Sequence, residues 1–362
     1  MSPMYEVLFI QMKVLIVYPE FWIDGGAERV IIRLCNYLTE HNIDNTILTT
    51  KMIPEIKLQL TETRIIEVGS LDNVQNMLHS ISTDFDVINV HNEPCQLLVY
   101  PKNMNTIWSF NELPSKIQLG GTGTLPEMEI KIVQNFIKKI IVADETNKKK
   151  VKDVYNKDSI VIPYGIDFDF FQMHGAEDMR KRYGIEKDDF VITQVGFIAP
   201  TKNQIESVKI LAEVKKKIPN AKLILAGSFT DYKKDVEQEI MKNKLYNEVI
   251  FTGQLNREEI RDLLKTSDVA IQPNKGQGSW LSVFEVAACY VPVIVSKEFT
   301  ASNLVEKYGD YVCSTIEEYV NAIMMEKQAE YPNEKMHDFA KTLTWDKYCE
   351  RMVGVFNESL VN

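Results

Sequence analysis

Three segments of the chain combine a glycine turn with a polar side chain that could bind an anion or a diol. The sharpest spans residues 272–296, QPNKGQGSWLSVFEVAACYVPVIVS, where a strand end, a glycine loop, a helix and a proline-led strand follow one another. Glu285 falls inside the otherwise apolar helix. A buried carboxylate needs hydrogen-bond partners, and the two hydroxyls of a diol meet that need. The alternative is that Glu285 caps or pairs locally.

A second segment, residues 193–204 (TQVGFIAPTKNQ), runs from a predicted strand through Gly196 to a lysine at a helix start. At such a corner Lys202 could hold a phosphate as a point charge beside the positive end of the helix dipole. Taken alone, the same residue is more typical of a solvated first-turn lysine.

The third segment follows the first predicted strand and reads PEFWIDGGAER over residues 19–29. Gly25 and Gly26 would let the backbone approach a ligand and leave amides available at the positive end of a helix. A plain strand-to-helix turn capped by Asp24 explains these residues equally well. The segment lacks the G-x-G-x-x-G fingerprint, which weighs against a dinucleotide.

The elements that position these segments are read from hydrophobic periodicity. Apolar, β-branched runs alternate with amphipathic stretches, and the runs are continuous, as is typical of strands buried on both faces. Strands are predicted at Lys13–Tyr18, Asn45–Thr50, Arg64–Val68, Asp86–His91, Thr106–Phe110, Lys139–Ala143, Phe190–Val195, Lys222–Ala226, Val249–Thr252, Val269–Gln272 and Val291–Ser296. Helices are predicted at Ala27–Glu40, Asn203–Lys217, Asp231–Lys244, Arg257–Thr266 and Phe284–Ala288. This alternation predicts an α/β protein with parallel sheets and right-handed crossovers.

The chain length of 362 residues fits two domains or one large α/β unit. The strand–helix rhythm pauses at Ile160–Gln172, where Pro163 and Gly165 punctuate a segment that we expect to be an extended linker. We therefore predict a first domain over 1–165 and a second over 166–344. Two doubly wound domains facing one another would form a cleft at the carboxyl ends of both sheets.

Composition narrows the function classes. A net charge of −10 argues against a broad footprint on nucleic acid, and five scattered cysteines without a C-x-x-C pair favour a reduced, cytoplasmic compartment without a metal site. No uncharged apolar run reaches the ~18 residues of a membrane span. Residues 1–11 are interpreted as a leader or the product of an upstream start codon, and Asp84–Asp86 and Asp167–Asp169 as turn and cap aspartates rather than metal ligands.

In order along the chain, the motifs resemble those of the family-4 glycosyltransferases, retaining nucleotide-sugar enzymes with the GT-B fold. The resemblance covers almost the whole chain but no single motif is decisive. The matching segments are GGAERV (25–30), VIPYGID (161–167), VGFIAPTKN (195–203), KLILAG (222–227), VIFTG (249–253), SDVAIQP (267–273), QGSWLSVFE (277–285) and AACYVPVI (287–294). Thr344, Trp345 and the terminal helix, about 345–362, resemble the segment that crosses back onto the first domain.

The resemblance implies a nucleoside-diphosphate sugar as donor, a glycan, glycolipid or other molecule as acceptor, and neither metal nor separate cofactor. Glu285 would bind the ribose, and Lys202 would bind the diphosphate. His91, Gln277 and Lys202 are the catalytic candidates. The remaining expected donor-site residues are Gly25, Gly26, Gly196, Phe197, Gly278, Leu281, Ser282 and Val283, and Asn111 and Glu112 are expected on the acceptor side.

Three departures from the family pattern stand at the expected site. Gln277 replaces the first glutamate of E-x7-E, Phe197 replaces the arginine of V-G-R, and Trp280 stands where a glycine is usual. Loss of the arginine removes a charge-assisted contact worth roughly 1.5–3 kcal/mol. An altered donor, a weak enzyme, and a degenerate scaffold that binds a nucleotide sugar or a partner enzyme without turnover all remain open. Lys275 is a candidate for the missing cation.

Lys131–Lys157 carries eight lysines against three acids. It is interpreted as a solvated helix face, with peripheral contact to anionic lipid as the alternative. The histidines outside the expected site are taken as surface residues: His41, His79, His174 and His337.

Overall fold

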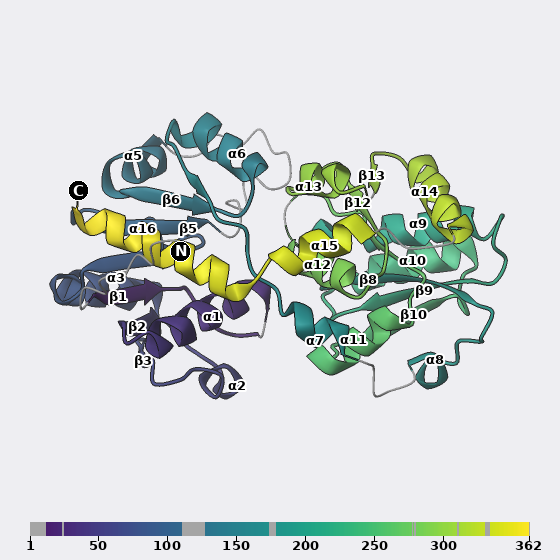
Figure 1. The fold of residues 1–362 in the computed structure, drawn as a ribbon, viewed down its shortest axis with the longest axis horizontal. Helices are drawn as coiled ribbons and strands as arrows, with labels where there is room; N and C mark the ends of the chain where they lie inside the picture. Colours follow the sequence, from purple (N-terminus) through teal and green to yellow (C-terminus); the bar gives the residue numbers. More distant parts are fainter. Residues whose placement is uncertain are drawn as a thin grey trace, which may run out of the picture. The chain divides into compact units, whose positions relative to one another are not determined.

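A computed structural model describes residues 12–23, 25–110, 127–173, 179–276, 278, 280–309, 311–329 and 334–361. The chain divides into two compact units, with the divisions between Gly165 and Ile166 and between Thr344 and Trp345. The segment after Thr344 belongs to the first unit. Each unit is an α/β structure around a parallel sheet (Figure 1), so the predicted fold class is confirmed.

The first unit contains a seven-stranded parallel sheet in the order β3-β2-β1-β4-β5-β6-β7. Strands β4 and β5 are buried along their whole length, as their continuous apolar runs predict. The strands are β1 (Lys13–Val17), β2 (Asp44–Thr49), β3 (Arg64–Glu67), β4 (Val87–His91), β5 (Thr106–Phe110), β6 (Lys139–Val142) and β7 (Ile160–Val161). The described helices are α1 (Gly26–Glu40), α2 (Pro54–Lys57), α3 (Leu71–Ile81), η1 (Ser82–Asp84), α5 (Glu127–Phe136), α6 (Glu145–Tyr155) and α16 (Trp345–Val361).

The second unit contains a six-stranded parallel sheet in the order β10-β9-β8-β11-β12-β13. The strands are β8 (Phe190–Val195), β9 (Ala221–Ala226), β10 (Val249–Gly253), β11 (Val269–Gln272), β12 (Val293–Ser296) and β13 (Tyr311–Cys313). The described helices are α7 (Phe168–Gln172), α8 (Met179–Arg182), η2 (Pro200–Lys202), α9 (Gln204–Val214), α10 (Lys233–Asn243), α11 (Arg257–Lys265), α12 (Trp280–Ala288), α13 (Ser302–Lys307), α14 (Ile316–Gln328) and α15 (Glu334–Thr342).

The predicted linker Ile160–Gln172 contains the division between the two units, which falls after Gly165. The segment is not extended throughout, because Ile160–Val161 pairs with β6 as an edge strand and Phe168–Gln172 forms α7. Pro163 and Gly165 lie between these two elements, so the irregular part of the segment is confined to the residues around them. The short strand β13 was also not predicted, since three residues, of which only Cys313 is buried, leave too little pattern to detect.

Helix α16 packs on the first unit through contacts at both of its ends. Trp345, at its start, is buried and lies under the Arg33 guanidinium at 6.0 Å. Near its end, Ser359 Oγ accepts a hydrogen bond from Asn105 Nδ2 (3.0 Å) and Glu358 pairs with Lys139 (2.8 Å). The first unit therefore consists of two stretches of chain separated by the whole second unit.

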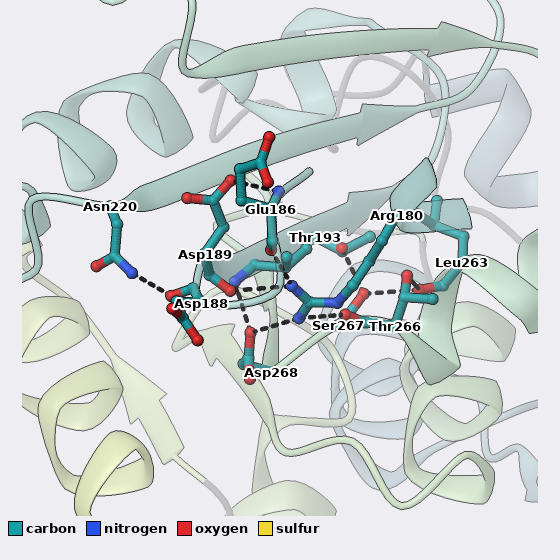
Figure 2. Close-up of polar contacts among 11 residues, drawn as sticks. Arg180, Glu186, Asp188, Asp189, Thr193, Asn220, Leu263, Thr266, Ser267 and Asp268 are labelled. Carbon is teal, nitrogen blue, oxygen red and sulfur yellow. Dashed lines mark hydrogen bonds and ion pairs between the residues drawn. The ribbon is translucent and has the colours of Figure 1, made fainter. Parts of the chain in front are cut away.

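A polar network anchors the amino edge of the second sheet (Figure 2). The guanidinium of Arg180 in α8 donates to the carbonyl oxygens of Glu186, Asp189 and Thr266 at 3.0–3.1 Å. Asp268, just before β11, accepts a hydrogen bond from the Val191 amide in β8 (2.6 Å). These contacts tie the starts of β8 and β11 together, at the edge opposite to the carboxyl ends of the strands.

Replacing Asp268 tests this anchor. Asp268→Ala leaves the buried Val191 amide without its acceptor and should lower the free energy of unfolding by about 1–3 kcal/mol. Asp268→Asn retains an acceptor oxygen and should lose less. Urea unfolding measures both variants, and equal stability of Asp268→Ala and wild type would contradict the assigned role.

Candidate functional site

At the carboxyl edge of the second sheet, two glycine turns expose the main chain. Gly196 and Gly227 follow directly after β8 and β9, with φ of +150° and +153°, a region that side chains disfavour. A Cβ at Gly227 would overlap the carbonyl of Gly196, so the two turns touch backbone to backbone. In open parallel sheets ligands bind at this edge. The two glycines therefore leave the edge open for a ligand to approach the main chain.

The Lys202 side chain lies over the first of these turns. If Gly196 carried a Cβ, that atom would be 3.6–3.7 Å from Cγ, Cδ and Cε of Lys202. A Cβ at Gly278 would overlap the Lys202 Nζ. The side chain thus runs from η2 over the first glycine turn to the loop that leads into α12. Gly278 itself has a φ of +108°. The structure brings together the sequence-predicted Gly196, Lys202 and Gly278, and it places an ammonium group just before a helix start, where an anion is favoured.

Buried amide side chains hold the loops around Lys202 and were not identified from the sequence. Gln194 Nε2 donates to the Lys202 carbonyl (2.7 Å), and Gln204 Nε2 donates to the Phe197 carbonyl (2.8 Å). Across the sheet edge, Asn274 Nδ2 donates to the Gly278 carbonyl (3.1 Å). The sequence feature that could have revealed such buried amides is a glutamine near the end of an apolar strand, as at Gln194 and Gln272. These contacts fix the backbone that positions the lysine.

Helix α12 supplies the other predicted donor-site residues. Leu281 lies in its first turn, where the leading main-chain amides have no acceptor within the helix, and Val283 follows; both side chains are buried. Glu285 lies one turn beyond Leu281 and is only 7% exposed. Helix α12 therefore places its amino end and a buried carboxylate one turn apart. Phe197 is partly buried beside Gly196, whereas Gln277 lies outside the described residues.

His91 ends β4 in the first unit, and its ring is fully buried. Its Nε2 donates to Asn89 Oδ1 (2.8 Å), and Asn89 Nδ2 donates to Ser109 Oγ (2.9 Å). Because an amide oxygen only accepts, the Nε2 atom carries the proton. Burial lowers the pKa of His91 to about 3, so the ring is neutral near pH 7. At neutral pH, His91 is therefore suited to hydrogen bonding as a neutral ring rather than to acting as a cationic acid.

The glycine turn after β1 is built around a buried acid that the sequence analysis did not select. The N-cap position of α1 is occupied by Gly25, which has no side chain to cap the helix. Asp24, the predicted capping residue, lies outside the described residues. A Cβ at Gly25 would overlap the Glu28 carboxylate. Glu28 is buried and accepts a hydrogen bond from the Tyr18 hydroxyl (2.9 Å). Glycine at position 25 therefore makes room for this carboxylate. Asn111 and Glu112 lie outside the described residues.

Within the described part of the chain, no group of three or more His, Cys, Asp or Glu side chains is arranged to hold a metal ion. The two D-x-D segments have structural partners instead, since Asp86 accepts the Lys13 amide (2.8 Å) and Asp167 pairs with Arg257 (2.6 Å). One histidine prediction was wrong: His337 is buried, stacked at 3.5 Å on Tyr290, and burial lowers its pKa. His174 lies outside the described residues.

Solved structures define the class of the fold. The chain superposes on a glycosyltransferase from Rickettsia africae with a TM-score of 0.79 at 17% identity, over 97% of this chain and 99% of that one. Anabaena HepE in complex with UDP gives a TM-score of 0.78 at 16% identity, over 96% and 100% of the two chains. The fold is therefore GT-B, as the motif series implies.

Comparison with protein families matches part of the second unit. Residues 175–342 match the family described as glycosyl transferases group 1. A putative glycosyltransferase, EpsF of Bacillus subtilis, is 29% identical over 142 residues, or 39% of this chain and 36% of EpsF. The UDP-Gal:alpha-D-GlcNAc-diphosphoundecaprenol alpha-1,3-galactosyltransferase of Escherichia coli is 27% identical over 175 residues, 45% of this chain and 44% of the relative. The alignments thus span about a third to a half of these relatives.

The neutral His91 has a consequence for acid stability. Its pKa rises from about 3 in the folded protein to ~6.5 in the unfolded chain, so its contribution to stability is complete above pH 6.5 and is lost progressively as the pH falls toward 3. Between pH 7.5 and 5 the loss should be about 2 kcal/mol. Urea unfolding across this range should therefore show a shallower pH dependence for His91→Asn than for wild type. Parallel stability curves would contradict the assigned ionisation.

Proposed function

We propose that this protein transfers a sugar from a nucleoside-diphosphate sugar to an acceptor, and that the second unit binds the donor. The observation that carries the proposal is the course of Lys202, which passes over Gly196 to the loop before α12. A lysine ammonium and the first amides of a helix together suit a diphosphate, which needs several donors and positive charge. The match of residues 175–342 to group 1 glycosyltransferases supports the same assignment.

Glu285 completes the donor site in this proposal. A carboxylate buried to 7% exposure, one helical turn beyond the proposed phosphate-binding amides, can accept hydrogen bonds from both hydroxyls of a ribose. The nucleoside and the diphosphate would then be held by the same helix, α12. HepE was solved with UDP, and the Escherichia coli relative is named for UDP-Gal. Both names support a nucleotide donor for this chain.

Charge stabilisation of the leaving group is the main catalytic task in this proposal. As the bond between the sugar and the diphosphate breaks, negative charge grows on the phosphate oxygen, and Lys202 and the α12 amides would stabilise it without metal. Phe197 offers no charge there. Lys275 is an exposed second cation whose backbone amide is hydrogen-bonded to the Thr201 carbonyl (2.9 Å), beside Lys202.

Contacts to the transferring sugar complete the proposal. Gln277 would offer both a donor and an acceptor to sugar hydroxyls, and His91 would act as a neutral positioning group rather than as an acid. Gly25 and Gly26 would lie beneath the sugar. Asn111 and Glu112 would line the acceptor side. Retention of the anomeric configuration follows the family resemblance, and no covalent nucleophile is assigned.

The lysine-rich stretch 131–157 adds little support for lipid contact. Half of its eight lysines are in ion pairs: Lys131 with Glu127, Lys139 with Glu358, Lys148 with Glu145, and Lys152 with Asp158. Lys157 donates to the Gln134 carbonyl (3.0 Å). Among the described residues, no helix is both long and apolar enough to cross a bilayer. We therefore keep peripheral lipid contact outside the proposed function.

Assays with a panel of nucleotide sugars and glycan or glycolipid acceptors test the function directly. Release of nucleoside diphosphate together with a glycosylated product supports it. Tight nucleotide binding without turnover for any donor would instead establish the scaffold alternative that Phe197 and Gln277 raise.

Two variants test the donor site, and an exposed lysine provides the control for the first. Lys202→Ala and Glu285→Ala should each weaken UDP or GDP binding by about 1–3 kcal/mol, since each removes a charged hydrogen-bonding group. Lys234→Ala, an exposed lysine in α10, should leave affinity unchanged. Isothermal titration calorimetry on folded variants provides the measurement, and wild-type affinity in Glu285→Ala would remove the assigned ribose contact.

Metal removal tests the leaving-group mechanism. Because lysine and helix amides are proposed to stabilise the diphosphate, turnover should be unchanged after dialysis against a chelator. Activity that is abolished by EDTA and restored by Mn²⁺ or Mg²⁺ would overturn this mechanism while leaving the fold assignment intact.

A further inference from the structure

Trp22 is an exposed indole at the carboxyl edge of the first sheet. All four tryptophans of the chain are described, and the other three, Trp108, Trp280 and Trp345, are 0%, 6% and 9% exposed, against 64% for Trp22. Trp22 lies in the loop between β1 and the glycine turn that starts α1. Strand β1 pairs with β4, which ends at His91, so this loop follows a strand next to the one that ends in the candidate histidine.

The backbone directly before Trp22 is paired with a neighbouring segment. The Phe21 amide donates to the Lys51 carbonyl (2.9 Å), and the Phe21 carbonyl accepts from the Ile53 amide (3.0 Å), forming a parallel bridge of Phe21 with Met52. The Phe21 ring is fully buried and meets Tyr18 edge-on at 4.7 Å. Successive side chains of an extended segment point to opposite sides, so anchoring Phe21 inward presents Trp22 outward. The exposed ring therefore follows directly on an anchored residue.

The exposed face of an indole ring is suited to stacking on a pyranose ring. Its negative face attracts the weakly positive C–H groups of a pyranose ring, and stacking buries apolar area with little loss of side-chain freedom. Glu20, near Trp22 in the sequence, and Lys51, whose carbonyl binds the Phe21 amide, are exposed, and a carboxylate and an ammonium group can both bind sugar hydroxyls.

We propose that Trp22 is a stacking platform for a pyranose ring of the acceptor, so that the acceptor is a saccharide or carries one. The inference rests on the proposed glycosyl transfer for its role, while the stacking itself can be measured without turnover. Trp22 belongs to the first unit and lies outside the family match over residues 175–342.

Fluorescence quenching tests the stacking alone. As the one exposed tryptophan, Trp22 should account for the emission quenched by acrylamide, and Trp22→Phe should abolish most of that quenching. Methyl hexopyranosides and malto- or lacto-disaccharides, added as probes, should protect the wild-type signal. Absence of protection by every saccharide in the panel would overturn the proposal, even if nucleotide binding and transfer are found.

Kinetics test the role in transfer. With a saccharide acceptor that the wild type uses, Trp22→Ala should raise the acceptor KM about tenfold with little change in donor KM, and Trp22→Tyr should restore most of the affinity. Tyr246→Ala removes a comparably exposed ring (62%) from the second unit and should change neither value. An unchanged acceptor KM in Trp22→Ala, or a loss confined to binding of anionic vesicles or to self-association, would overturn the proposal.

Discussion

The contact between the main chains of Gly196 and Gly227 is the constraint on which the candidate site depends. Because neither position has a side chain, the ends of β8 and β9 approach closely. The aliphatic part of Lys202 packs over the space that a side chain at Gly196 would occupy. The ammonium group then reaches Gly278, another position where a side chain would collide with it. The three glycines thus determine the position of the Lys202 ammonium group.

Buried amides make this arrangement rigid. Gln194 binds the carbonyl of Lys202 and is itself held by the Ser207 hydroxyl (2.6 Å), so the lysine's own backbone is tied to β8 and α9. Preorganisation of this kind matters because electrostatic stabilisation is effective only when the charges need not reorganise during the reaction. In the proposed mechanism Phe197 offers no charge, so stabilisation of the leaving group would depend on the position of Lys202.

Much of this was predictable from the sequence, and the limits have physical causes. Continuous apolar runs identified the predicted strands to within about two residues, because strands buried on both faces leave an unambiguous pattern. The pairing of Lys202 with Gly196 followed from their place after one strand. Glu28 was missed because a glutamate in a helix's first turn is ordinary in solvent, and only tertiary packing shows that it is buried under Tyr18. His337 was misplaced for the same reason: aromatic neighbours from α7 and the end of α12 bury it, and they are distant in sequence.

The position of α16 makes the first unit discontinuous, and this affects the order in which the chain can fold. Residues 166–344 are contiguous, so the second unit can complete its core as soon as that stretch has been synthesised. The first unit cannot, because the surface that receives Trp345 and Cys349 stays uncovered until synthesis has passed through the entire second unit. The unit that begins first is therefore finished last, and in the meantime its apolar surface is open to non-native contacts.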